Sequence, residues 1–365
     1  MEKAVTDLSR ATAGEDLRVD YSSIEKSLAE LWRAENTDPE HAVTRAALWN
    51  VVAHTGTPEG HAHASDTLAR ASAAVPQRSI IVRANPAAEA ELASWISANC
   101  HLAGAGKQVC SEEIAIVAGG EHVQRVPPLV NALLIPDMPV AVWWIGDLPN
   151  EHEAYVTSLL EPADRIVVDS VHFDRPADLD LVYRVGKETT TAPADLNWIR
   201  LEEWRAATAT LFDPPAMRER LRKIRAVRVA AMTSEDYFGQ MVEALYYAAW
   251  LTAQLGHGID ESGKVDGPGG SIDYSFQRRS GGEAGTVAAV EISFEDGTQA
   301  TIARDAERGV VTTNVDGNVF VPDSVTRTLG KRQDELIVRL LKRPDGDQLL
   351  LKVLPVATLM AKRLE

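Results

Sequence analysis

The chain has 365 residues, 45% hydrophobic and 25% charged, which is typical of globular proteins and long enough for two domains. Its 53 acidic and 37 basic side chains give a formal net charge of −16, which disfavours binding to nucleic acid or anionic lipid. The sequence lacks a run of roughly 18 apolar residues, a secretory signal and a set of paired cysteines, so we expect a cytoplasmic protein that does not enter membranes.

The first half of the chain alternates apolar runs with amphipathic helical patterns. After a polar leader, a helix is predicted over 22–34. Apolar runs predict strands at 47–53, 79–82, 113–117, 140–145 and 165–169. Helical spacing predicts helices at 64–74, 87–98, 128–135 and 151–160. Such alternation is typical of right-handed crossovers, so the predicted fold class is α/β, with a mostly parallel sheet and flanking helices.

The strand at 140–145 ends in Trp143 and Trp144, followed by a Gly/Asp/Pro exit that contains Asp147. Neighbouring side chains of a strand point to opposite faces, so the two indoles are expected on opposite sides of a central strand. A place in the core is the simpler interpretation of both. The alternative is an anchor for a partner protein, because tryptophan is enriched at interface hot spots.

The second half is expected to be a C-terminal α+β domain. Helical patterns cover 195–255, where Met217, Leu221 and Ile224 begin one helix, and the glycine-rich segment 256–285 is interpreted as a loop. Alternating apolar residues and two Asp-Gly turns predict an antiparallel meander over 287–322, and closing helices follow at 332–342 and 349–364. The expected division is therefore 1–37 for a leader and helix, 38–175 for the α/β domain and 176–365 for the C-terminal domain.

Two short stretches suggest ligand chemistry, but each has a simpler interpretation. Gly104–Lys107 resembles part of a phosphate loop, yet Gln108 stands where a magnesium-binding Ser or Thr is needed, so a plain turn is favoured. His54, His61 and His63 lie within ten residues, and His61 and His63 could place two imidazoles on one metal ion, but no further ligand stands out nearby. A polar loop explains the histidines equally well.

Cys100, Cys110 and Arg78 each allow two interpretations. If the helix at 87–98 continues, Cys100 extends its apolar stripe as a buried thiol. The alternative is a redox pair of Cys100 and Cys110 joined across the 101–109 turn, which requires their Cα atoms to lie within about 7 Å. Arg78, at the start of a strand, could bind an anion or a partner, but an ordinary salt bridge is the simpler interpretation. No set of residues combines an acid, a base and a binding loop.

Several segments, in order and at plausible spacing, resemble the OpcA family of cyanobacteria and actinobacteria, which are assembly proteins of glucose-6-phosphate dehydrogenase. The segments that carry this resemblance are Thr44–Val52, Pro76–Val82, Cys110–Ile114, Pro128–Trp144, Asp164–Ser170, Asp195–Arg205 and Trp250–Gly256. The sequence departs from the family pattern at Met138, at Gln77–Ser79 and at Gln254.

The resemblance implies a non-catalytic bacterial protein of the oxidative pentose phosphate pathway, without a cofactor, whose partner is glucose-6-phosphate dehydrogenase. Such a protein would act as an allosteric activator by stabilising the active oligomer, a shift of population that requires no active site. Trp143, Trp144, Asp147 and Arg78 are the candidate contact residues. The alternative is an enzyme that binds a sugar phosphate or nucleotide at the carboxyl ends of the parallel strands.

Overall fold

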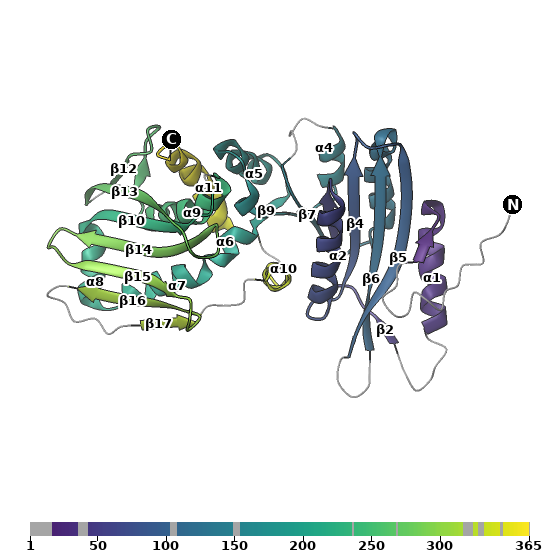
Figure 1. Ribbon diagram of the computed structural model, residues 1–365, viewed down its shortest axis with the longest axis horizontal. Helices are drawn as coiled ribbons and strands as arrows, with labels where there is room; N and C mark the ends of the chain where they lie inside the picture. Colours follow the sequence, from purple (N-terminus) through teal and green to yellow (C-terminus); the bar gives the residue numbers. More distant parts are fainter. Residues whose placement is uncertain are drawn as a thin grey trace. The chain divides into compact units, whose positions relative to one another are not determined.

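The computed structural model divides the chain into two compact units (Figure 1). Unit 1 is Met1–Val168 with Arg332–Asp345, and unit 2 is Asp169–Lys331 with Gly346–Glu365. The residues that the structure describes are 17–35, 43–102, 108–148, 154–235, 237–267, 269–316, 324–327, 332–343 and 346–364.

The structure divides the units after Val168, whereas the sequence analysis expected a boundary after residue 175, and two further features differ. The N-terminal helix belongs to unit 1 and does not form a separate part. The closing helices are divided between the units: α10 (Gln333–Leu341) belongs to unit 1 and α11 (Gln348–Ala361) to unit 2. A return of the chain to an earlier unit cannot be recognised from local periodicity.

The sheet of unit 1 has the strand order β1-β5-β6-β4-β3-β7-β8, and β2 pairs with β6. Neighbouring strands from β6 to β8 run parallel, whereas β5 is antiparallel to both β1 and β6. The α/β fold class is therefore confirmed. The strands are β1 (Leu17–Val19), β2 (Val43–Arg45), β3 (Trp49–Thr55), β4 (Gln77–Asn85), β5 (Glu91–Leu102), β6 (Gln108–Gly119), β7 (Val140–Trp144) and β8 (Arg165–Val168).

Helices cover both faces of this sheet. Gln77 donates from Nε2 to the Leu68 carbonyl of α2, which lies in front of the strands in Figure 1. The next residue, Arg78, reaches Glu25 of α1 and the Leu133 carbonyl of α3, so α1 and α3 cover the opposite face. The helices are α1 (Ile24–Glu35), α2 (Pro58–Ser72), α3 (Val126–Leu133) and α4 (Ala154–Leu160).

The helix expected at 87–98 is wrong, because β5 occupies this segment. Its residues pair with β6 in an unbroken register from Glu91 opposite Gly119 to Leu102 opposite Gln108. The spacing of Leu92, Trp95 and Ile96 suits a helix face, but a ladder to a strand further along the chain decides the conformation. This tertiary pairing outweighs the local pattern.

The sheet of unit 2 has the order β11-β12-β13-β10-β14-β15-β16-β17, with α7 and α9 on one face, behind the strands in Figure 1. The expected meander is confirmed in β14, β15 and β16, and Gly297, with φ +81°, makes the first turn. The strands are β10 (Ile224–Met232), β11 (Gly258–Ile259), β12 (Val265–Gly267), β13 (Gly270–Arg279), β14 (Thr286–Phe294), β15 (Gln299–Asp305), β16 (Val310–Asp316) and β17 (Ser324–Arg327).

The remaining elements of unit 2 are helices and one strand. They are η4 (Ser170–His172), α5 (Pro176–Glu188), β9 (Ala192–Asp195), α6 (Leu196–Arg200), α7 (Glu202–Leu211), α8 (Pro215–Arg218), η5 (Glu219–Lys223) and α9 (Gly239–Gln254).

Two further expectations for unit 2 are wrong. The glycine-rich segment 256–285 contains β11, β12 and β13, and in β13 the buried Ile272 and Tyr274 alternate with exposed polar residues. The helix expected to begin near Met217 ends at Arg218, and Ile224 begins β10 in the middle of the sheet. In β13 the glycine-rich composition concealed the alternation of buried and exposed side chains.

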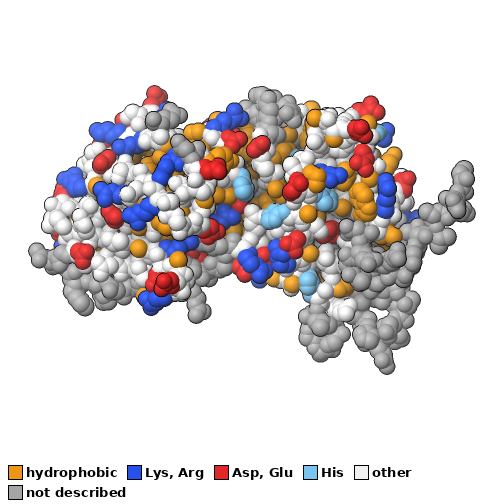
Figure 2. All heavy atoms as spheres, viewed as in Figure 1, with side chains coloured by type: hydrophobic (Ala, Val, Ile, Leu, Met, Phe, Trp, Pro, Cys, Tyr) orange, Lys and Arg blue, Asp and Glu red, His pale blue; other side chains and the backbone are white. Residues whose placement is uncertain are grey.

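The face of the unit 2 sheet seen in Figure 2 is mostly polar, with basic and acidic side chains interspersed. An antiparallel-rich sheet with one solvated face needs no covering layer. Within the described parts of the chain, no helix has the length and apolar character that crossing a membrane requires.

Candidate functional site

The two tryptophans at the carboxyl end of β7 lie in the core. The ring centroids of Trp143 and His63 on α2 lie 6.0 Å apart, and Trp144 stacks on His54 with ring centroids 4.0 Å apart. The two indoles therefore have different neighbours, as strand alternation predicts. Both side chains are buried, and Trp144 donates from Nε1 to the Asp147 carbonyl at 2.8 Å. A partner does not reach either indole in this conformation, and Asp147 is the exposed member of this group.

His54 and Tyr155 form an aromatic cluster with Trp144. Burial lowers the pKa of His54 to about 4 and raises that of Tyr155, so both side chains are neutral at pH 7. Both ring nitrogens of His54 and the Tyr155 hydroxyl lack hydrogen-bond partners in the described structure. Among the described residues, no group of three His, Cys, Asp or Glu side chains is arranged to hold a metal ion.

The amino end of α2, between β3 and β4, is where a doubly wound fold would bind a phosphate. Two of its donors are already used: Thr57 N–H donates to the Thr55 hydroxyl at 3.3 Å, and Gly60 N–H donates to the Thr57 hydroxyl at 3.0 Å. Pro58 has no N–H, and Glu59 adds negative charge to the first turn. This end therefore fits a phosphate poorly. The Gly104–Lys107 turn lies outside the described residues.

Arg78 is buried in an ion pair with Glu112 of β6. Its Nε donates to Glu112 Oε2 at 2.8 Å, its Nη2 lies 2.7 Å from the same oxygen, and its Nη1 donates to Glu25 and to the Leu133 carbonyl. The arginine therefore joins β4, β6, α1 and α3. This geometry favours the salt-bridge interpretation and removes Arg78 from the surface that a partner could contact.

A second arginine binds the same carboxylate from the surface. Arg45 Nε lies 2.7 Å from Glu112 Oε1, which also accepts a hydrogen bond from Trp32 Nε1. The Arg45 guanidinium lies 6.0 Å from the Trp32 ring centroid. The Arg45 side chain is 47% exposed, compared with 3% for Glu112. A buried carboxylate thus holds an exposed arginine in place.

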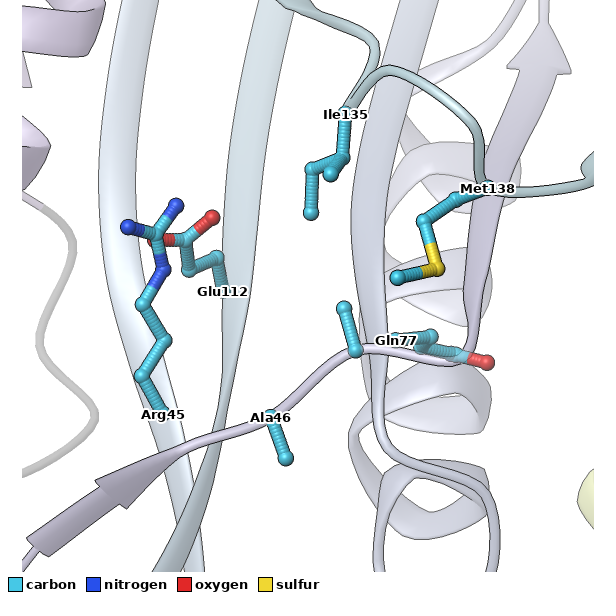
Figure 3. A pocket seen from close by; sticks show the side chains of 7 residues that line it. Arg45, Ala46, Gln77, Glu112, Ile135 and Met138 are labelled. Carbon is cyan, nitrogen blue, oxygen red and sulfur yellow. The ribbon is translucent and has the colours of Figure 1, made fainter.

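Beside Arg45 lies a pocket of about 270 Å³. Arg45 and Glu112 lie on one side of it, and Ile135 and Met138 lie across from them (Figure 3). Ala46, Ala47 and Gln77 complete the lining. All these residues come from four of the family-like segments, which the fold brings together although they span 44–144 in the sequence.

The pocket opens at the amino ends of the parallel strands. Gln77 is the first residue of β4, and Met138 precedes the start of β7. Enzymes with open α/β sheets bind their substrates at the opposite, carboxyl edge. The position of the pocket therefore suits recognition of another molecule better than chemistry at a switch point.

Cys100 and Cys110 form a disulfide, with Cα atoms 4.0 Å apart, directly opposite one another on β5 and β6. The expectation of a thiol that continues a helix is therefore wrong, and the joining that a redox pair requires is present. On the other side of β6, Cys110 pairs with Arg45 of β2, and its carbonyl accepts from Ala46 N–H at 3.1 Å. The disulfide thus anchors the strand segment that carries the pocket wall.

Unit 2 contains a buried polar cluster that sequence reasoning missed. Arg200 donates to both carboxylate oxygens of Asp169 at 2.7 Å, and Tyr246 donates to Asp195 at 2.7 Å. Burial, and then the nearby Asp169 charge, raise the pKa of Asp195 to about 6. Asp195 has no exposed surface, so a substrate does not reach it. The segments that contain Asp169 and Asp195 carry the family resemblance. Neither sequence segment shows, however, that the two lie side by side in the folded chain.

Comparison with known families gives a consistent result for both halves of the chain. Residues 69–184 match the glucose-6-phosphate dehydrogenase subunit N-terminal domain, and residues 191–354 match the C-terminal domain of the same family. The chain belongs to the OpcA family. The resemblance drawn from the sequence segments is thereby confirmed.

Two cyanobacterial relatives, both OxPP cycle proteins named OpcA, match part of the chain. The protein from Synechocystis is 33% identical over 150 residues, which are 40% of this chain and 30% of the relative. The one from Synechococcus elongatus is 29% identical over 168 residues, which are 45% of this chain and 36% of the relative. The matched region thus spans about a third of these relatives' length.

Among solved structures, a 3-ketoreductase from Actinomadura kijaniata is similar, with 9% identity, a TM-score of 0.47, and coverage of 86% of this chain and 94% of that chain. At these values the similarity says nothing about chemistry.

Proposed function

We propose that this protein is a non-catalytic assembly factor and allosteric activator of glucose-6-phosphate dehydrogenase, acting in the cytoplasm in the oxidative pentose phosphate pathway. The observation that carries this proposal is the match of both halves of the chain to the two domains of the glucose-6-phosphate dehydrogenase subunit family. The family is named for a relation to that enzyme, which makes the enzyme the first partner to test.

The arrangement of polar groups supports a binding role over a catalytic one. At the amino end of α2, the Thr57 and Gly60 N–H groups already donate to hydroxyls within the cap, and Asp195 has no exposed surface. The pocket beside the exposed Arg45 lies at the amino ends of the parallel strands. These features count against the alternative of a nucleotide- or sugar-phosphate-binding enzyme.

The proposed mechanism is a shift in the oligomer equilibrium of the dehydrogenase. A protein that binds the active oligomer tenfold more tightly than the inactive form shifts the equilibrium by about 1.4 kcal/mol. Only the difference between the two affinities matters, so no residue of this chain has to take part in the reaction.

The test is to assay the dehydrogenase of the same organism with and without this protein, over enzyme concentrations that span dissociation of its oligomer. We expect activation to be largest at low enzyme concentration, where the inactive form predominates. An unchanged kcat, KM and oligomer at every concentration would contradict the proposal. A screen of the isolated protein with nucleotides and sugar phosphates tests the enzyme alternative, for which we expect no thermal shift.

A further inference from the structure

The pocket beside Arg45 has the chemistry of a carboxylate site. Glu112 holds Arg45 through Nε, and the two terminal amino groups of Arg45 have no partner among the described residues. A guanidinium fixed in this way keeps N–H donors for a carboxylate, which it can bind with two parallel hydrogen bonds. Because the other end of the arginine is already anchored, little side-chain freedom is lost on binding.

The size of the pocket and its opposite wall limit what fits. Ile135 and Met138 are apolar and face the Arg45 side across about 270 Å³. Pockets for small-molecule ligands usually have about 300–1,000 Å³, so this one suits a single short side chain. A carboxylate on an aliphatic stem would place its charge at Arg45 and its methylene groups against Ile135 and Met138.

An exposed leucine next to the pocket lining indicates that the carboxylate belongs to a protein. Leu48 follows Ala46 and Ala47 directly and is 58% exposed, the highest value for a large hydrophobic side chain among the described residues. A partner that covers Leu48 gains from removing this apolar surface from water. Arginine is enriched among the residues that contribute most to binding energy at protein interfaces.

We propose that this pocket is a docking site for a glutamate or aspartate side chain of a partner protein, with Arg45 binding the carboxylate and Leu48 buried beneath the partner. That the partner is glucose-6-phosphate dehydrogenase rests on the proposed function. The carboxylate chemistry of the pocket does not.

The first arm of the test measures the Kd of the full chain for the dehydrogenase. Arg45→Ala and Leu48→Ser should each weaken binding at least tenfold, and Arg45→Ala should also reduce the dependence of Kd on salt concentration. Two matched controls should change Kd less than twofold: Lys26→Ala, which removes a 79% exposed cation of unit 1, and Val325→Ser, which alters a 53% exposed aliphatic side chain of unit 2.

The second arm needs no dehydrogenase and uses n-butyrate and its uncharged analogue n-butyramide, followed by NMR. The wild-type chain should bind butyrate and not butyramide, and Arg45→Ala should lose this binding. Leu48→Ser, at a solvent-exposed position, should retain it. Circular dichroism establishes that each variant is folded.

The two arms separate the possible outcomes. Failure of the wild-type chain to bind butyrate overturns the carboxylate site, whatever the dehydrogenase does. Butyrate binding together with normal dehydrogenase binding by Arg45→Ala and Leu48→Ser overturns docking and identifies a site for a free carboxylate. If the wild-type chain binds butyrate but not the dehydrogenase, the proposed function fails and the pocket chemistry stands.

Discussion

Glu112 in unit 1 and Asp195 in unit 2 are both buried carboxylates, but their partners differ. Glu112 forms ion pairs with Arg45 and Arg78 and accepts a hydrogen bond from the Trp32 indole, so its charge is balanced by cations in direct contact. Asp195 accepts from a tyrosine hydroxyl and two backbone N–H groups, and the cation of its cluster, Arg200, binds Asp169 instead. The pKa of Asp195 is raised to about 6, because neutral donors do not offset burial and the neighbouring charge.

The surroundings of the two carboxylates also differ in their access to solvent. Glu112 binds an exposed arginine, whereas Asp195 is fully buried. The exposed arginine, Arg45, lines a pocket. The carboxylate can therefore hold the arginine in position to bind a ligand there. Asp195 joins η4, α6 and α9 and has no exposed surface, so we expect it to contribute to the stability of unit 2. Both clusters arise from family-like segments, and only their surroundings distinguish their roles.

The largest expected effect is in the interior cluster. Arg200→Ala leaves Asp169 buried without its cation and should lower the free energy of unfolding of unit 2 by about 4 kcal/mol. The matched control is Arg184→Ala, which breaks the solvent-exposed pair with Asp180 and should cost about 0.5 kcal/mol. Urea denaturation measures both, and similar losses would show that burial does not decide the value of these pairs.

Asp195→Asn should have an effect that depends on pH. Because the pKa of Asp195 is raised to about 6 in the folded protein, its contribution to stability is present below the ordinary value of 3.8 and is lost as the pH rises through 6. The variant should therefore gain roughly 3 kcal/mol relative to the wild type between these limits. A difference that does not change between pH 4 and pH 8 would contradict the raised pKa.

Glu112→Gln should lower the stability of unit 1 at pH 8, whereas Asp195→Asn should raise the stability of unit 2. Removing this charge leaves Arg78 buried without its main counter-ion, so unit 1 should lose about 2 kcal/mol. The substitution also loosens Arg45, so butyrate binding should weaken at least threefold. If Glu112→Gln instead stabilised unit 1, the charge of Glu112 would not be balanced by its arginines, and the proposed difference from Asp195 would be wrong.

The smallest expected effect concerns the disulfide. Reduction, or Cys100→Ser, should lower the stability of unit 1 by about 1–2 kcal/mol, because the β5–β6 ladder already holds the two strands together. The thermal unfolding temperature with and without a dithiol reductant measures this effect. If Cys100→Ser and the wild type respond to reductant equally, the pair has no redox role.

The sequence predicted most of the parallel sheet, because β3, β4 and β7 are buried apolar runs whose composition alone identifies them. It also located the β14–β15 turn, since Asp296-Gly297 needs no tertiary partner to form. It missed β5 and β13, whose conformations depend on pairing with strands elsewhere in the chain.

The candidate site was less predictable than the fold. The family-like segments were recognised, but nothing in them showed that Arg45, Glu112 and Met138 meet at one pocket. Trp143, Trp144 and Arg78 were chosen because of their residue types, and the structure places all three inside. Exposure, which distinguishes Arg45 from Arg78, is a property of the packed unit and has no local sequence signal.

The most direct test of the account is the sedimentation velocity of the dehydrogenase, diluted until its oligomer dissociates, with an excess of this protein. We predict that the wild-type chain restores the larger species and that the Arg45→Ala, Leu48→Ser double variant does not. A sedimentation profile that the wild-type chain leaves unchanged would contradict the central claim that this protein acts by binding the enzyme's active oligomer.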